Sequence, residues 1–240
     1  MPVLQMANVL GIIPARGGST GIPNKNLVPL CGRPLLAYTG DAVKGSARLT
    51  RTVVSTDDPR IAECATSLGL EVPFMRPSSL AGDGVPMLPV LQHAVAALES
   101  EGFTADIVVL LQPTSPLRRG EHIDAAVTWL ERAGGDSVVS VVEVPHQFNP
   151  TSVMRVEDGL LKPFLAGPAA TRRQDKPRVL ARNGPAVLAV KASVLRDGSL
   201  YGARTWPLLM SPEDSLDIDT LWDLRLVEAV LSASTNAHSL

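Results

Sequence analysis

A glycine-rich loop with a basic residue near each end follows the first apolar segment of the chain, residues 9–13. Three glycines and two cations make up its chemistry: Gly17, Gly18, Gly21, Arg16 and Lys25. Because glycine has no side chain, a ligand can approach the backbone N–H groups closely, and the cations add positive charge. This composition suits a polyphosphate, although the spacing matches neither the Walker P-loop nor the G-x-G-x-x-G fingerprint. An ordinary flexible glycine-rich turn is the alternative that the spacing leaves open.

Two aspartates near the C-terminus form a second group with chemical potential. Asp217 and Asp219 lie in the sequence SLDIDT and are separated by two positions. In an extended segment this spacing points both carboxylates to the same face. Two hard oxygen donors on one face suit Mg²⁺ or Mn²⁺. The alternative is that Asp219 and Thr220 cap the helix that follows.

The end of an apolar strand, residues 106–112, carries three polar side chains. Gln112 is a neutral amide that can hydrogen-bond a base or a sugar, and Thr114 and Ser115 add hydroxyl groups. Turn formation between Pro113 and Pro116 is the competing interpretation.

Two further groups of charges have structural and functional interpretations. Asp57 and Asp58 could hold a metal, but their position before residues 59–68 favours helix capping and interaction with the helix dipole. The segment 167–182 holds five of the 22 basic residues, which would normally form a solvated face. An acidic substrate would give such guanidinium groups a bidentate partner.

Short apolar runs predict strands, and the segments between them with helical periodicity predict helices. These strands and helices would position the candidate site residues. Strands are expected at 9–13, 51–56, 71–76, 106–112, 137–144, 185–190 and 204–210. Helices are expected at 33–45, 59–68, 87–101, 121–133, 191–201 and 221–231. This alternation indicates one α/β domain over residues 1–240, with a Rossmann-like, mostly parallel sheet flanked by helices and a site at the carboxyl ends of the strands. Residues 146–182 interrupt the rhythm as an insertion, with a hairpin turn at Asp158-Gly159.

Composition limits the class of protein. The chain has 240 residues and a net charge of −2, with an isoelectric point near 6.1, so we expect no nucleic-acid partner. Cys31 and Cys64 have no metal-ligand spacing and imply no disulfide framework, so we expect both to be reduced. The N-terminus lacks a signal-peptide pattern, and no apolar run is long enough to span a bilayer. We therefore expect a cytoplasmic protein without a membrane partner.

Residues 12–27, IIPARGGSTGIPNKNL, resemble the N-terminal signature of the acylneuraminate cytidylyltransferases, which activate sialic acids and related nine-carbon acids as CMP-sugars. Further similar segments follow in the family's order: RPSSLAGD (76–83), LLQPTSPLR (110–118), RRQDKP (172–177), RNGPAVLAV (182–190) and SLDIDT (215–220). Together they span most of the chain and are far more specific than any one of them. The chain departs from the signature at Thr20, where the family normally has a lysine.

The resemblance implies a nucleotidyltransferase fold and a transfer of CMP from CTP to a nonulosonic acid, with release of pyrophosphate. It implies CTP contacts from Ala15, Arg16, Gly17, Gly18, Ser19, Lys25, Asn26, Arg76 and Asp83. It implies acid-substrate contacts from Gln112, Thr114, Ser115, Arg173, Gln174 and Asn183. Catalysis would rest on Arg16, Lys25, Asp217 and Asp219, with the two aspartates as ligands of Mg²⁺ (or Mn²⁺).

The resemblance also implies a homodimer, in which the insertion packs against a partner subunit. The alternative is a hairpin that only covers a sheet edge. Two other functions stay open: CMP transfer to a different acid, such as another keto-deoxy acid or a phosphonate, and a nucleotide-binding module without turnover, for which the absent lysine at Thr20 is the only support.

Overall fold

The central element of the computed structural model, which describes residues 7–19, 21–165 and 172–237, is a seven-stranded sheet. Its strand order is β11-β6-β10-β5-β1-β4, and β9 pairs with the free part of β6. The strands are β1 (Val9–Pro14), β4 (Arg51–Ser55), β5 (Ile107–Leu110), β6 (Ser137–Glu143), β9 (Leu180–Arg182), β10 (Leu188–Lys191) and β11 (Thr205–Leu209). The pairings give five strands one common direction, and β9 and β10 run against them. The expected mainly parallel α/β sheet is therefore confirmed.

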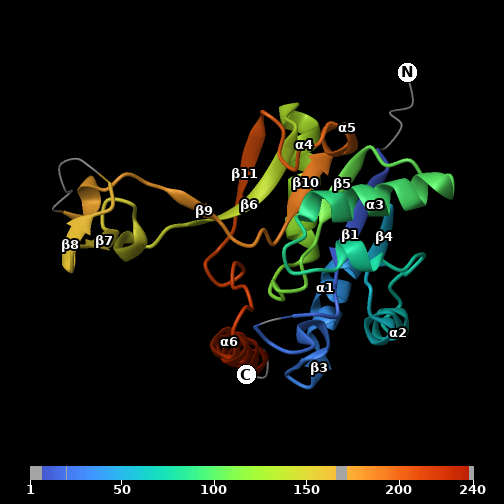
Figure 1. Cartoon of the computed structure of the whole chain (residues 1–240), viewed down its shortest axis with the longest axis horizontal. Coiled ribbons are helices and arrows are strands. Elements are labelled where there is room, and N and C mark those ends of the chain that lie inside the picture. Colours follow the sequence, from blue (N-terminus) through green and yellow to red (C-terminus); the bar gives the residue numbers. More distant parts are fainter. Residues whose placement is uncertain (1–6, 20, 166–171, 238–240) are drawn as a thin grey trace.

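Helices cover both faces of this sheet (Figure 1). They are α1 (Leu35–Lys44), α2 (Pro59–Ser67), α3 (Met87–Ser100), α4 (Gly120–Ala133), α5 (Ala192–Arg196) and α6 (Leu221–Ala237). One buried cluster joins Ile13 and Val109 to α1, α2 and α4, and a second joins Leu10 and Ile12 to α3 and α5. Side chains of a strand alternate between faces, so β1 must be apolar at nearly every position to serve both clusters. The central strands β1 and β5 thus place their carboxyl ends side by side.

A third buried cluster fixes the C-terminal helix beside the glycine-rich loop. It consists of Ile22, Leu30, Leu35, Ile218, Leu224 and Val227. Ile218 is fully buried in it, and burial of an isoleucine side chain stabilises the fold by about 1.5–3 kcal/mol. This packing brings the SLDIDT segment to the start of the chain.

Residues 71–76 do not form the predicted strand. They make only two isolated bridges, Glu71 to Val53 in β4 and Met75 to Thr56 directly after β4. Pro73 lies between them and has no N–H to donate to a ladder, which explains why regular pairing does not form. Three short strands were not predicted: β2 (Pro29–Leu30) and β3 (Arg33–Pro34) pair with each other before α1, and β9 pairs with β6.

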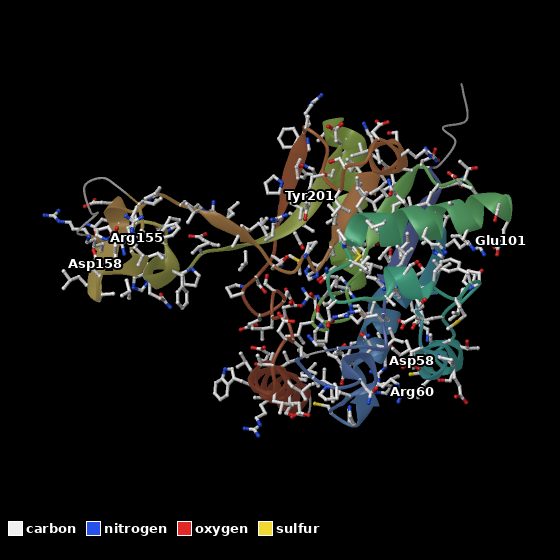
Figure 2. The ribbon with its side chains drawn as sticks, in the orientation of Figure 1. Asp58, Arg60, Glu101, Arg155, Asp158 and Tyr201 are labelled. Atoms are coloured by element: carbon white, nitrogen blue, oxygen red, sulfur yellow. The ribbon has the colours of Figure 1, made fainter. Side chains whose placement is uncertain are left out.

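The insertion forms an arm that extends away from the body of the molecule (Figure 1). At its far end β7 (Met154–Glu157) and β8 (Leu160–Pro163) form the predicted hairpin. Asp158 and Gly159 have φ values of 55° and 77°, the left-handed conformations that a two-residue hairpin turn requires. Figure 2 shows the hairpin, marked by Arg155 and Asp158, at a distance from the sheet, so it does not cover a sheet edge.

None of the described helices combines the length and the apolar character needed to cross a bilayer.

Candidate active site

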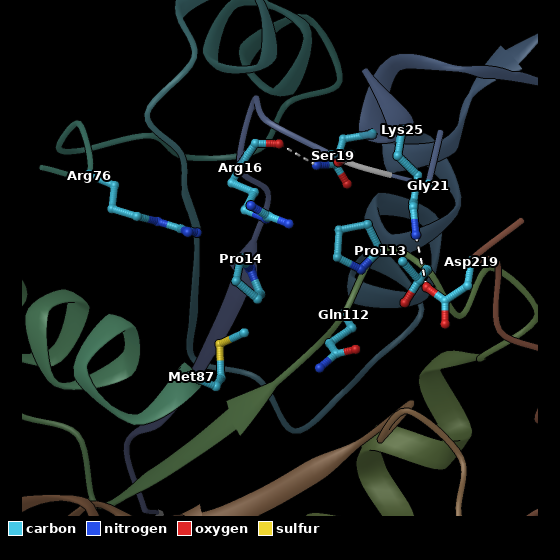
Figure 3. Close-up of a pocket in the computed structure, with 12 residues that line it drawn as sticks. Pro14, Arg16, Ser19, Gly21, Lys25, Arg76, Met87, Gln112, Pro113 and Asp219 are labelled. Atoms are coloured by element: carbon cyan, nitrogen blue, oxygen red, sulfur yellow. Dashed lines mark hydrogen bonds and ion pairs between the residues drawn. The ribbon is translucent and has the colours of Figure 1, made fainter. Parts of the chain in front are cut away.

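A cavity of about 450 Å³ opens at the carboxyl ends of β1 and β5 (Figure 3). Residues from five separate segments of the sequence line it: Pro14, Arg16, Ser19, Gly21, Lys25, Asn26, Arg76, Met87, Gln112, Pro113, Thr114 and Asp219. Most of these residues were predicted from the sequence to contact a nucleotide or an acid. The fold therefore gathers them around one space.

Lys25 connects the glycine-rich loop to the SLDIDT segment. Its Nζ donates to the carbonyl oxygen of Ile218 and to Oδ1 of Asp219, each at 2.9 Å (Figure 3). Gly21 lies against the same segment, because a Cβ at this position would be 2.5 Å from the carbonyl oxygen of Asp219. Any larger residue would force the loop and the aspartate segment apart.

Asn26 and Asp83 hold Arg16 from two sides. The Asn26 amide Nδ2 donates to the carbonyl oxygen of Arg16 at 3.0 Å, and the Arg16 guanidinium pairs with the Asp83 carboxylate. Asp83 is not part of the lining, so the structure places it against Arg16 rather than on the cavity wall. Asn26 is buried, and its hydrogen bond to Arg16 holds the glycine-rich loop in its conformation.

The backbone of the glycine loop is only partly available to a ligand. Ala15 is buried, and its N–H donates to Ser55 at 3.0 Å. The N–H of Gly17 donates to Oδ1 of Asp57 at 3.0 Å. Among Gly17, Gly18 and Ser19, only Ser19 lines the cavity.

Asp57 and Asp58 have different roles. Asp58 is the N-cap of α2 and accepts a hydrogen bond from the N–H of Arg60 at 2.8 Å, as the capping interpretation predicts. Asp57 contacts Gly17 instead. The two carboxylates thus make separate structural contacts, Asp57 with the glycine loop and Asp58 with the first turn of α2.

Arg76 is a buried cation on the cavity wall, with 5% of its surface exposed. Its guanidinium donates to Oγ and to the carbonyl oxygen of Ser55, at 3.1 and 2.5 Å. Burial lowers the pKa of Arg76, and the nearby Asp57 carboxylate opposes this shift. Figure 3 shows the side chain extending toward the centre of the cavity.

Asp217 and Asp219 flank the buried Ile218 but have different environments. The Asp219 side chain is 74% exposed and pairs with Lys25. Asp217 accepts a hydrogen bond from the Ser115 hydroxyl at 3.2 Å, and burial raises its pKa. The Thr220 half of the capping interpretation is correct: the Thr220 hydroxyl oxygen accepts the N–H of Asp223 at 3.3 Å, and the Asp223 carboxylate accepts the N–H groups of Asp219 and Thr220. The carboxylate of Asp219 is therefore not used as a cap.

The residues predicted to bind the acid are spread over three places. Gln112 and Thr114 line the cavity, and hydrogen bonding by the Thr114 side chain opposes the raised pKa of Asp217. Asn183 is buried in a network, donating to Ser215 at 2.9 Å and accepting from Ser140 at 2.6 Å, so it supports the fold beside the site.

Gln174 is exposed on the arm, in a short helical turn, Arg173–Asp175. The Arg173 side chain and Thr20 lie outside the described residues.

Arg118 is an important residue that the sequence analysis did not single out. Its guanidinium is buried and donates to the carbonyl oxygens of Gln112 and Ala186 at 2.9 and 3.0 Å, and to the Thr39 hydroxyl at 2.7 Å. Burial lowers its pKa to about 9. Arg118 is the last residue of the segment LLQPTSPLR. Its position shortly after the end of a strand could have marked it in the sequence as a residue near the site.

A family model described as cytidylyltransferase matches residues 10–166. The chain belongs to the cytidylyltransferase family. This match covers the glycine loop, Arg76 and the end of β5, so most of the cavity wall lies inside the family model.

Curated relatives of this cytidylyltransferase are themselves named as cytidylyltransferases or as synthases of CMP-linked acids. The CMP-N,N'-diacetyllegionaminic acid synthase of Legionella pneumophila is 34% identical over 230 residues, covering 95% of this chain and 98% of the relative. The N-acylneuraminate cytidylyltransferase of Streptococcus agalactiae serotype V is 34% identical over 87% of this chain, which spans about half (50%) of that relative. The Campylobacter jejuni pseudaminic acid cytidylyltransferase is 26% identical over 91% of this chain and 94% of the relative.

Solved structures show the same fold at low sequence identity. A CMP:2-keto-3-deoxy-manno-octonic acid synthetase complexed with CTP has a TM-score of 0.71 and 19% identity, covering 95% of this chain and all of the other. The 4-diphosphocytidyl-2C-methyl-D-erythritol synthase of Anaerococcus prevotii has a TM-score of 0.64 and 13% identity, with 94% and 96% coverage. These likenesses establish the nucleotidyltransferase fold of the chain.

Proposed function

We propose that this cytidylyltransferase transfers CMP from CTP to a nonulosonic acid, an N-acylneuraminate or a close relative, with release of pyrophosphate. The observation that carries the proposal is the contact of Lys25 with Asp219, which unites the two chemical segments of the sequence at one cavity. The relative that matches almost end to end is named as a synthase of a CMP-linked acid, which supports the same substrate class.

In the proposed reaction the anomeric hydroxyl oxygen of the acid forms a bond to the α-phosphorus of CTP. The bond from this phosphorus to the bridging oxygen breaks, pyrophosphate leaves, and the hydroxyl proton passes to solvent. Such a transfer depends mainly on positioning and on stabilisation of charge. Arg16 and Lys25 would supply positive charge to the triphosphate, with the N–H groups near Ser19. Asn26 and Arg76 would lie at the cytidine end.

The residues of the aspartate segment fit a divalent cation. Asp217 and Asp219 offer hard carboxylate oxygens, and burial, with the neighbouring Asp219 charge, raises the pKa of Asp217, an effect that a bound cation would oppose. We propose that these two side chains hold Mg²⁺ (or Mn²⁺). The bound cation would neutralise charge on the phosphates and on the leaving group.

The acid would bind beside the strand end that carries Gln112 and Thr114, with Ser115 supporting Asp217. Arg173 and Gln174 lie on the arm, which extends away from the cavity of its own chain (Figure 1). We therefore propose a homodimer in which the arm of one subunit brings these residues to its partner's site.

The hairpin supports this dimer. Side chains alternate along paired strands, and one face of the hairpin presents Met154, Val156 and Leu161, of which Val156 and Leu161 are directly opposite each other. Val156 and Leu161 are 72% and 70% exposed. Apolar residues gathered on one exposed face mark an interaction surface.

We also propose a cytoplasmic location. Cys31 and Cys64 are both free thiols, as expected in a reducing compartment.

The experiment that tests the function measures pyrophosphate release from CTP and Mg²⁺ with a panel of acids: N-acylneuraminates, legionaminic and pseudaminic acids, a keto-deoxy-octonic acid and a phosphonate. We expect turnover with one or more nonulosonic acids and little with the eight-carbon acid or the phosphonate. Turnover with only the eight-carbon acid or the phosphonate would show that the acceptor is not a nonulosonic acid. CTP binding without any turnover would indicate a nucleotide-binding module.

A further inference from the structure

The turn between β4 and α2, together with the first residues of α2, contacts the glycine loop at both ends of the loop. At the start of the loop, Oδ1 of Asp57 accepts the N–H of Gly17 at 3.0 Å. Near its end, Nη2 of Arg60 donates to Oδ1 of Asn24 at 2.9 Å. Figure 2 places Asp58 and Arg60 together at this turn. The turn is thus a frame for the loop that lines the cavity.

The frame leaves little freedom to the loop. A Cβ at Gly17 would lie 2.7 Å from Oδ2 of Asp58 and 2.8 Å from its Cβ. Asp58 cannot easily yield, because it caps α2 and pairs with Arg60 at 2.6 Å. The backbone of Gly17 is therefore pressed against the turn, and Asp57 fixes the direction of its N–H.

We propose that Asp57 is a positioning residue of the nucleotide site, which holds the Gly17 N–H and so keeps the glycine loop in the conformation that receives CTP. Asp57 is not part of the cavity lining, so it acts through Gly17 rather than on the substrate. This inference rests on the proposed function, because the site it organises is the proposed CTP site.

Replacement of Asp57 by alanine leaves the Gly17 N–H without its acceptor. We expect Asp57→Ala to raise the KM for CTP at least about 10-fold while kcat at saturating CTP stays within about threefold. Asp57→Asn keeps an acceptor oxygen at Oδ1, so we expect its KM for CTP within about threefold of wild type. This rescue by the conservative variant is what a positioning hydrogen bond predicts.

The experiment combines pyrophosphate-release kinetics with calorimetric titration of CTP into the full chain in the presence of Mg²⁺. Asp41→Ala is the matched control, since Asp41 is an aspartate on α1 that pairs with Arg33 at 2.8 Å away from this cavity. Its KM for CTP should be unchanged. If Asp57→Ala does not fold, Asp57→Ser removes the long acceptor with a smaller loss of volume and should show the same KM effect.

An unchanged KM for CTP in folded Asp57→Ala or Asp57→Ser would overturn the inference. An equal KM defect in Asp57→Asn and Asp57→Ala would also overturn it, because the acceptor oxygen would then not matter. A wild-type protein that binds no CTP would overturn the proposed function together with the inference. Wild-type activity with an unaffected alanine variant would remove the inference alone.

Discussion

Lys25 and Asp219 are 194 positions apart in the sequence, yet the Lys25 Nζ lies 2.9 Å from the Asp219 Oδ1. The lysine side chain is 12% exposed and the aspartate side chain 74% exposed. The mostly buried lysine therefore holds an aspartate that is open to solvent. This contact joins the candidate phosphate loop to the candidate metal ligands.

Asp219→Asn should lower kcat at least about 100-fold and leave the fold intact. The carboxylate is exposed, so its loss removes little packing, while loss of a metal ligand removes several kcal/mol of transition-state stabilisation. Pyrophosphate release over a Mg²⁺ titration, with a thermal melt as the folding control, checks both statements. Asp197→Asn, at the end of α5, is the charge-matched control. Near-normal turnover of folded Asp219→Asn would contradict the metal assignment.

Arg173→Ala should weaken use of the acid far more than use of CTP. Loss of a bidentate partner of a carboxylate costs about 2–5 kcal/mol when the pair is desolvated. We expect the effect in the KM or kcat/KM of the acid, measured at saturating CTP. A rise in the KM for CTP instead would assign Arg173 to the nucleotide. Arg155→Ala, in the exposed hairpin, serves as the control.

Thr20→Lys should raise kcat about 5- to 100-fold. A lysine would add a cation near the developing phosphate charge, which is worth about 1–3 kcal/mol when water is largely excluded. Stability should change little. If kcat stays the same or falls with every acid that the wild type accepts, compensation by another basic residue or a rebuilt acceptor site becomes the better explanation.

Leu161→Lys should dissociate the proposed homodimer, because it places a charge on the exposed apolar face of the hairpin. Lys162→Ser changes the opposite face and should leave the dimer intact. Sedimentation velocity distinguishes the two. We expect the monomeric Leu161 variant to lose turnover, since its arm would no longer reach a partner. A wild-type protein that sediments as an active monomer would contradict the dimer.

His122 should make stability depend on pH between about 5 and 7.5. Its Nδ1 accepts the N–H of Arg119 in the cap of α4, and burial lowers the pKa of His122. The unfolded chain therefore binds more protons than the folded chain near pH 6.5, and the free energy of unfolding rises with pH and is lost on acidification. Asp214 and Glu121 oppose this shift, whereas Arg119 and Arg118 reinforce it.

Glutamine at position 122 can make the same cap without titrating. We expect the wild type to lose about 0.5–1 kcal/mol more than His122→Gln between pH 7.5 and pH 5.5, in urea unfolding. Equal losses would show that His122 does not control this pH response.

The sequence by itself determined the local elements of this protein. The apolar run of β1 ends at Pro14, the dipeptide Asp158-Gly159 adopts the turn that its residues favour, and the helical spacing of residues 87–101 gives α3. These features depend on neighbours a few positions apart, so periodicity and turn chemistry are sufficient to predict them. The i, i+2 spacing of Asp217 and Asp219 predicted that both carboxylates point to one face, but their environments differ: Asp217 is buried beside Ser115 and Asp219 is exposed beside Lys25.

Tertiary structure decided the contacts that define the site. Residues 71–76 are apolar enough for a strand, but Pro73 leaves only two isolated bridges. β10 runs antiparallel between β5 and β6, a direction that no local pattern encodes. The approach of Gly21 to Asp219, the acceptance of the Gly17 N–H by Asp57 and the burial of Arg118 all join segments that are distant in sequence. Such contacts depend on which faces of the elements pack together, and the burial of Ile218 beside α6 fixes that choice.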